Sequence, residues 1–175
     1  MHGFAFAEDR RFPSFIGVDD HPMRALELKI PPPIVAVLVA AVMWGISLAT
    51  PSADVSAPIR LVAAIALALA GLATAVSGAV AFRRAKTTAS PLKPETTSSL
   101  VISGVYRFTR NPMYVGVALI LLAWAVSLSS IWTLLGPLIF ILYITRFQII
   151  PEERTLAGIF GAAYSTYTAK VRRWL

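Results

Sequence analysis

The sequence predicts an all-α integral membrane protein with four transmembrane helices and a C-terminal amphipathic helix on the cytoplasmic side. Of its 175 residues, 57% are hydrophobic and 14% are charged, whereas a typical soluble domain has about 25% charged residues. The hydrophobic residues form four long runs, each near the length that crosses a bilayer. The cations gather in alternate connections between these runs, as the positive-inside rule requires.

Residues 1–30 differ in composition from the rest of the chain. They mix acidic and basic side chains without an apolar period, which is typical of a disordered arm. The charged stretch is long and has no evident small-residue cleavage site, so a signal peptide is not indicated. Met23 is an alternative translation start, because the segment after it resembles a short lead into a first membrane helix. The membrane domain is therefore expected at 31–175.

The first two spans are expected at about 34–50 and 59–82. Three prolines at 31–33 precede the first run, and proline is tolerated at the beginning of a helix. The second run is rich in alanine and glycine, and such small residues allow helices to approach closely in lipid. Neither run contains an acidic residue, so we interpret both as packing helices.

The third and fourth spans are expected at 113–128 and 131–150, joined by a tight serine turn. The fourth run contains Pro137, a residue that can kink a helix, and Arg146 near its end. The connections 51–58 and 127–130 carry almost no cations, whereas 83–110 and 151–175 are rich in them. This asymmetry predicts an inner-membrane protein with both termini in the cytoplasm.

A tail helix is expected at 152–174. It begins Pro151-Glu152-Glu153, and acidic side chains stabilise the positive end of the helix dipole. Apolar and aromatic residues then recur at three- and four-residue spacing. We expect this amphipathic helix to lie on the membrane or to cap the bundle.

The composition excludes several kinds of chemistry. The chain has no cysteine, and its only histidines, His2 and His21, lie in the arm. Thiolate nucleophiles and a cysteine or histidine metal site are therefore not expected in the membrane domain. The net charge of +7 comes from cations that flank apolar runs, so membrane topology explains it better than nucleic-acid binding does.

The most informative segment is VISGVYRFTRNPMYVG at 101–116, which meets the third apolar run directly. Lipid tolerates its arginines and asparagine poorly, so they are expected to face a protein cavity or the water interface. The predicted topology brings this segment to the same membrane face as Glu152 and Glu153. That coincidence indicates a built pocket rather than a solvated surface.

These two motifs resemble the isoprenylcysteine carboxyl methyltransferase and phospholipid methyltransferase superfamily, over about residues 59–175. The first motif of that superfamily is matched by Gly104, Tyr106, Arg107, Arg110, Pro112, Tyr114 and Gly116. The second is matched by Glu152, Glu153, Leu156, Phe160, Gly161, Tyr164 and Tyr167. The loop AFRRAKTTASPLKP is similar to the preceding loop of bacterial members.

The resemblance implies methyl transfer from S-adenosylmethionine at the membrane interface. The implied cofactor-binding residues are Tyr106, Arg110, Asn111, Pro112, Met113, Tyr114, Glu152 and Glu153. A carboxylate suits the ribose hydroxyls or the ammonium group of the cofactor, and an arginine suits its carboxylate. Backbone amides near Asn111 are further candidates for that carboxylate, because a helix begins there.

The acceptor decides which residues take part in the chemistry. An ionised carboxylate is already nucleophilic, and Arg146 and Arg154 are the candidates to hold it. An amine or a thiol must first lose a proton, for which Glu152 or Glu153 would be the base. Asn111 stands where the eukaryotic carboxyl methyltransferases have histidine, so transfer to that family's own acceptor does not follow from the resemblance.

We therefore expect O-methylation of a small lipophilic carboxylate. The alternative within the superfamily is an amine or thiol methyltransferase, such as one that acts on phospholipid headgroups. A small four-span transporter is a different class, but it would need an ionisable residue inside a span, and the only charged residue in the first three runs is Arg60, at the very beginning of the second. A non-catalytic membrane scaffold would be indicated by failure to bind S-adenosylmethionine.

Overall fold

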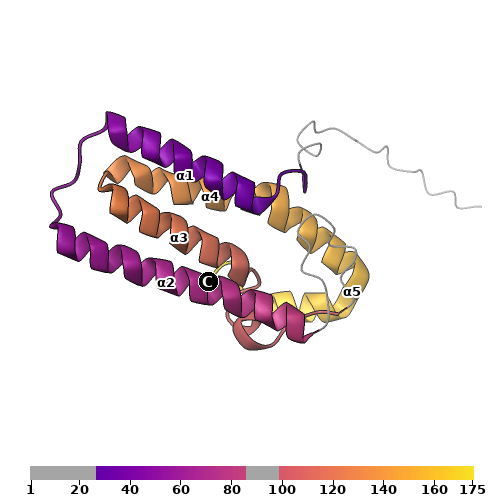
Figure 1. Cartoon of the computed structure of the whole chain (residues 1–175). Helices are drawn as coiled ribbons and strands as arrows, with labels where there is room; N and C mark the ends of the chain where they lie inside the picture. The colour runs from indigo at the N-terminus through magenta and orange to yellow at the C-terminus, as the bar shows by residue number, and fades with distance from the viewer. Residues whose placement is uncertain (1–26, 86–98) are drawn as a thin grey trace, which may run out of the picture.

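Residues 27–85 and 99–175 are described by a computed structural model, and they form an all-helical bundle (Figure 1). The four apolar helices lie side by side in the order α1, α4, α3, α2, with contacts between each neighbouring pair. Their bounds are Pro32–Ala49 for α1, Ala57–Arg84 for α2, Pro112–Leu128 for α3 and Leu135–Ile144 for α4. The all-α prediction with four apolar helices is confirmed.

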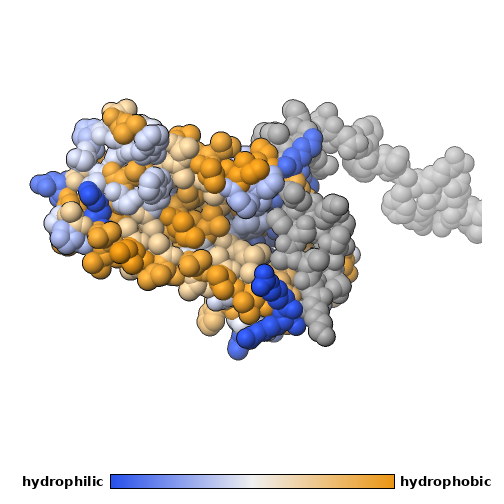
Figure 2. All heavy atoms as spheres, viewed as in Figure 1, coloured by the Kyte–Doolittle hydropathy of each residue, from blue (hydrophilic) through white to orange (hydrophobic). Residues whose placement is uncertain are grey.

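Within residues 27–85 and 99–175, three helical stretches are long and apolar enough to cross a membrane: Pro32–Ala49, Ala57–Arg84 and Ile131–Lys170. The apolar part of the last stretch is the predicted run 131–150, and α3, with 17 residues, is slightly shorter. Large apolar side chains on the outer faces of α1 and α2 are exposed. Figure 2 shows hydrophobic residues over much of this face, as expected of a surface in contact with lipid.

The fourth span is less regular than the sequence suggests. It begins as a 3-10 turn at Ile131–Leu134, continues as α4, and widens into a π-helical turn at Thr145–Ile149 before α5. Pro137 lies at the beginning of α4, next to the 3-10 turn, and is buried. The π-helical turn directly precedes the glutamate pair, and such turns are frequent at functional sites.

The tail differs from the single helix expected at 152–174. Helix α5 spans Ile150–Lys170, and its backbone is broken at Gly161, with φ 49° and ψ −123°. The second half of α5 folds back toward the ends of α2 and α3 (Figure 1). Glycine permits this conformation because it has no Cβ. Apolar periodicity does not reveal such a break, because the spacing of apolar residues continues through it.

Close packing between α2 and α3 positions the first motif. A Cβ atom at Gly116 would lie 2.5 Å from the carbonyl oxygen of Gly71, and one at Gly78 would lie 3.0 Å from Met113. The small residues of α2 therefore allow the close approach that its composition predicts. The buried core of the bundle contains Val35, Met43, Tyr114, Leu121, Ala125, Phe140, Ile144 and Ile149.

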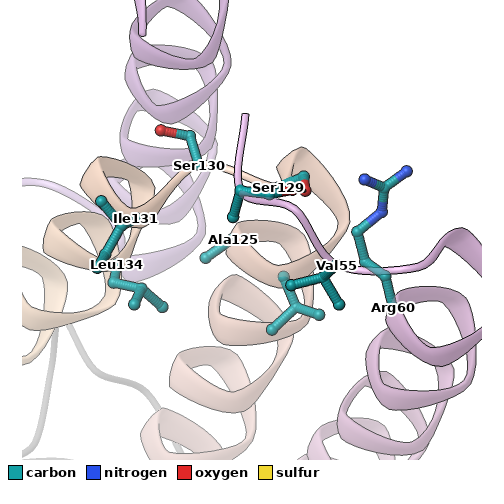
Figure 3. Close-up of a pocket in the computed structure, with 9 residues that line it drawn as sticks. Val55, Arg60, Ala125, Ser129, Ser130, Ile131 and Leu134 are labelled. Carbon is teal, nitrogen blue, oxygen red and sulfur yellow. Dashed lines mark hydrogen bonds between the residues drawn. The ribbon is translucent and has the colours of Figure 1, made fainter. Parts of the chain in front are cut away.

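An apolar pocket of about 220 Å³, whose lining is shown in Figure 3, lies at the end of the bundle where α2 begins and α3 ends, away from α5 (Figure 1). Its lining comes from the connection before α2, the end of α3 and the turn that follows it, and includes Val55, Ala125 and Leu134. Arg60 contributes a charged side chain to this lining. Because the two motifs lie at the other end, this pocket is separate from the site described next.

Candidate functional site

The first motif forms a compact turn at the end of the bundle. Gly104 begins a 3-10 turn, Gly104–Arg107, with φ at +62°, a value that favours glycine. Tyr106 is buried, and its ring meets that of Phe82 edge-on at 5.4 Å. Tyr167, from the returning half of α5, donates a hydrogen bond to the Tyr106 carbonyl at 2.8 Å. The break in α5 therefore brings the end of the second motif onto the first.

A tyrosine–glutamate pair connects the two motifs at the membrane edge. The hydroxyl of Tyr114 donates to Oε1 of Glu152 at 2.6 Å. Burial raises the pKa of Glu152 to about 7, and the negative charge of Glu153 adds to this, whereas the Tyr114 hydrogen bond opposes it. In the described part of the chain, Oε2 of Glu152 has no hydrogen-bond partner. We therefore consider this oxygen a candidate contact for a ligand.

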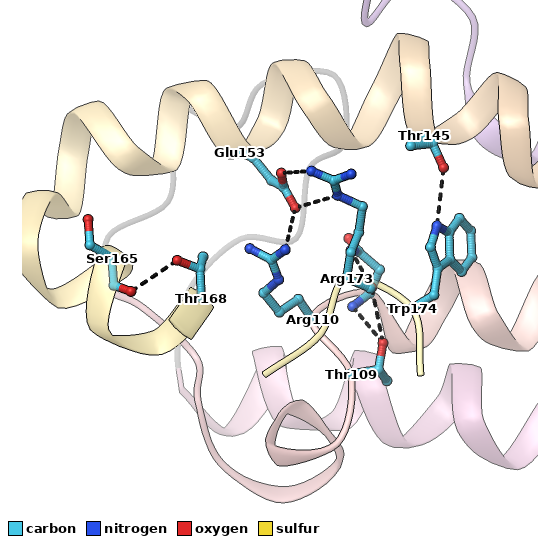
Figure 4. A network of polar contacts seen from close by, with 9 residues as sticks. Thr109, Arg110, Thr145, Glu153, Ser165, Thr168, Arg173 and Trp174 are labelled. Carbon is cyan, nitrogen blue, oxygen red and sulfur yellow. Dashed lines mark hydrogen bonds and ion pairs between the residues drawn. The ribbon is translucent and has the colours of Figure 1, made fainter. Parts of the chain in front are cut away.

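Glu153 is held by two arginines (Figure 4). Arg173 donates from Nε to Oε1 at 3.0 Å and from Nη2 to Oε2 at 2.7 Å. Arg110 reaches Oε1 through Nη2 at 3.2 Å, and its side chain is only 13% exposed. The Nε atom of Arg110 is buried without a hydrogen-bond partner among the described residues. The cluster thus holds a buried cationic donor with unused capacity.

Residues 171–175, which we call the C-terminal strap, cross the first motif after α5 has ended. The Arg172 carbonyl accepts the backbone N–H of Arg110 at 3.0 Å. The Arg173 carbonyl accepts the side-chain amide of Asn111 at 2.9 Å and the hydroxyl of Thr109 at 3.3 Å. The Trp174 indole donates to the Thr145 hydroxyl at 3.1 Å. The strap thus connects the first motif to the π-helical turn.

The strap alters the role expected for the amides near Asn111. The N–H of Arg110 goes to the strap, and the N–H of Asn111 goes to the Thr109 hydroxyl at 3.2 Å. Both amides are therefore used within the chain rather than presented to a ligand. Pro112 and Met113 pack near Gly78 of α2. The contacts observed for these two residues therefore stabilise the packing of α3 against α2.

Arg146 and Arg154 form a second, separate cluster. Both donate to Oε1 of Glu27, at 2.7 and 3.0 Å. Burial acts to raise the pKa of Glu27, but hydrogen bonds and charge from the two arginines lower it overall. Among the described residues, no hydrogen bond or ion pair joins this cluster to Glu152 or Glu153. Of the three residues predicted to be catalytic, Glu153 thus lies apart from the two arginines.

Arg173 is the site residue that sequence reasoning missed. It lies 20 positions after Glu153, and the adjoining Lys170 and Arg172 make it look like part of a solvated basic face. The only local signal was Gly161, whose conformational freedom allows the chain to return. Within the described residues, no group of three or more acidic or histidine side chains could hold a metal ion.

Comparisons with known proteins identify the family of the chain. A family model described as phospholipid methyltransferase matches residues 59–163, from α2 through the first motif and the glutamate pair to the first residues after the break in α5, and so ends before Tyr164 and Tyr167. An uncharacterised protein of Haemophilus influenzae is 51% identical over 63 residues, which are 36% of this chain and the whole of that protein. No solved structure matches the chain significantly. The chain belongs to the phospholipid methyltransferase family, within the isoprenylcysteine carboxyl methyltransferase-like superfamily, and is a membrane methyltransferase.

Proposed function

We propose that this methyltransferase uses S-adenosylmethionine to methylate a small lipophilic acceptor at the cytoplasmic face of the inner membrane. The observation that carries the proposal is the joining of the two motifs through Glu152 and Glu153. Tyr114 holds Glu152 at 2.6 Å, and Arg110 approaches the neighbouring Glu153 at 3.2 Å. Glu152, with one oxygen that has no partner among the described residues, and Arg110, with an unpaired Nε, thus belong to the same cluster.

These groups fit the polar parts of the cofactor. The available oxygen of Glu152 suits an ammonium group or a ribose hydroxyl, and the buried Nε of Arg110 suits a carboxylate. S-adenosylmethionine, when bound, supplies an electrophilic methyl group on a sulfonium. The work left to the protein is to orient both reactants and to exclude water, which contributes more to such a displacement than acid–base groups do.

A carboxylate is our first choice of acceptor, because it needs no base. Arg146 and Arg154 already share the carboxylate of Glu27, which supports their proposed ability to hold an acceptor carboxylate. Glu153 is already bonded to two arginines. We therefore assign it to the arrangement of Arg110 and Arg173 rather than to the chemical step.

An amine acceptor on a phospholipid headgroup is the second candidate. The family description points to it, and so does the pKa of Glu152, which burial raises to about 7. A carboxylate with such a pKa is suited to accept a proton near neutral pH. In this case Glu152 would accept a proton from the acceptor amine rather than bind the cofactor.

The deciding experiment uses purified full-length protein with S-adenosylmethionine labelled in its methyl group and a membrane lipid extract. Methyl esters release volatile labelled methanol on mild alkaline treatment, whereas label in N-methyl and S-methyl groups stays non-volatile. Alkali-labile label supports O-methylation, and stable label in ethanolamine lipids supports the amine candidate. Absence of both labelling and calorimetric binding of S-adenosylmethionine would refute the cofactor assignment.

A further inference from the structure

We propose that Arg173 is a positioning residue, which draws Glu153 away from Arg110 and so leaves Arg110 able to bind the carboxylate of the cofactor. This inference rests on the function proposed above. Arg173 lies in the C-terminal strap, beyond the residues that the family model matches.

The contacts of Glu153 are unequal. Arg173 contacts both carboxylate oxygens, at 3.0 and 2.7 Å. Two parallel bonds from one guanidinium are the strong geometry for an arginine–carboxylate pair. Arg110 contacts one oxygen only, at 3.2 Å, which is longer than about 2.7–2.9 Å, the range of strong charged pairs. Glu153 is therefore bound mainly to Arg173.

Arg110 retains unused binding capacity as a result. Its side chain is buried, and its Nε has no partner among the described residues. A buried donor without a partner is costly, so an unpaired group of this kind calls for a specific explanation, and we take it to be a bound ligand. If Arg173 lost its charge, Glu153 would be free to pair fully with Arg110 and to compete there with an incoming carboxylate.

The strap has attachments that do not require the Arg173 side chain. The carbonyls of Arg172 and Arg173 accept hydrogen bonds from Arg110 and Asn111, and Trp174 bonds to Thr145. A substitution of the Arg173 side chain preserves these groups. The electrostatic role of the guanidinium is thus separable from the course of the backbone.

Two probes separate positioning from mere structural support. S-adenosylhomocysteine carries the amino-acid carboxylate, whereas 5′-methylthioadenosine lacks it. We expect Arg173→Gln to weaken binding of S-adenosylhomocysteine about tenfold, the loss typical of one charged hydrogen bond. Binding of 5′-methylthioadenosine should change less than about twofold, because it makes no contact that depends on a charged partner. Equal weakening of both probes would overturn the proposal.

A double variant provides a second test of the proposal. Adding Glu153→Gln to Arg173→Gln removes the carboxylate that would capture Arg110, so much of the affinity for S-adenosylhomocysteine should return. No recovery in the double variant would contradict the proposal. Lys170→Ala is the control for loss of charge, because Lys170 is exposed at the end of α5, and its affinities should match the wild type.

Calorimetry on the full chain in detergent gives all of these affinities. If Arg173→Gln does not fold, Arg173→Lys preserves the charge but not the double contact, and a smaller loss, still selective for the carboxylate-bearing probe, is expected. Failure of the wild type to bind either probe would refute the proposed function itself. Wild-type binding with unchanged affinity in Arg173→Gln would refute only this inference.

Discussion

Tyr114 and Glu152 meet across 38 residues of sequence, with the tyrosine hydroxyl 2.6 Å from a carboxylate oxygen. Tyr114 belongs to the beginning of α3, and Glu152 to the first turn of α5. The hydrogen bond occupies one oxygen of Glu152, and the other has no hydrogen-bond partner among the described residues. It therefore joins the two family motifs at the point where we place the cofactor.

Removal of this hydroxyl should reduce cofactor affinity. Tyr114→Phe preserves the packing of the ring but leaves Glu152 without its donor, so we expect about tenfold weaker binding of S-adenosylmethionine by calorimetry. Tyr143→Phe is the matched control, because Tyr143 makes a ring contact with Phe147 and no hydroxyl hydrogen bond among the described residues. Equal effects in the two variants would argue against a special role for Tyr114.

Glu152 should make the stability of the protein depend on pH. Burial raises its pKa from 4.5 to about 7, so the folded state holds the proton more tightly than the unfolded state does. Its stabilising contribution is complete below pH 4.5 and is lost as the pH rises through about 7. Glu152→Gln cannot ionise, so its melting temperature relative to wild type should rise between about pH 5 and pH 8. A constant difference would show that Glu152 is not titrating in this range.

The break in α5 should depend on Gly161. Its φ of +49° is unfavourable for any residue with a Cβ, so Gly161→Ala should lower the free energy of unfolding by about 1–3 kcal/mol. Gly158→Ala provides the comparison, since Gly158 lies in regular helix and an added Cβ there would meet nothing within 4 Å. That variant should gain about 0.5–1 kcal/mol. Unfolding in a single detergent measures both, and the reverse order would contradict the observed break.

The contact between α2 and α3 should be equally sensitive to added volume. Gly116→Ala would place a methyl group 2.5 Å from the Gly71 carbonyl oxygen, and overpacking of this kind costs about 1–3 kcal/mol. Gly45→Ala, in α1, meets nothing within 4 Å and should be neutral or stabilising. The difference in melting temperature between the two variants tests whether this pair of helices packs as closely as described.

Glu27 offers a test of the acceptor. If Arg146 and Arg154 hold an acceptor carboxylate, Glu27 competes for them, and Glu27→Gln should lower KM for a carboxylate acceptor. Stability should change by about 1 kcal/mol or less, because both arginines are substantially exposed. Asp54→Asn, an exposed acid at the other end of the bundle, controls for the change in net charge. An unchanged KM would remove the support for Arg146 and Arg154 as acceptor ligands.

The class of the protein, its four apolar helices and its two motifs could all be predicted from the amino-acid sequence. These properties depend on local composition. A run of apolar residues predicts a membrane span whatever helices it packs against, and an Arg-Asn-Pro step at the edge of the run can be recognised from the sequence alone. The same reasoning put Arg110, Tyr114, Glu152 and Glu153 in one region, and the structure joins them in pairs through hydrogen bonds and ion pairs.

The pairing of the charged groups, in contrast, depends on the path of the chain in three dimensions. The backbone at Gly161 turns the end of α5 back, and this brings Arg173 to Glu153. Arg146, inside the π-helical turn, and Arg154, in α5, both bond to Glu27, and among the described residues neither bonds to the glutamate pair. Apolar periodicity reveals none of these pairings, because that pattern records which face of a helix is apolar and not the path of the chain.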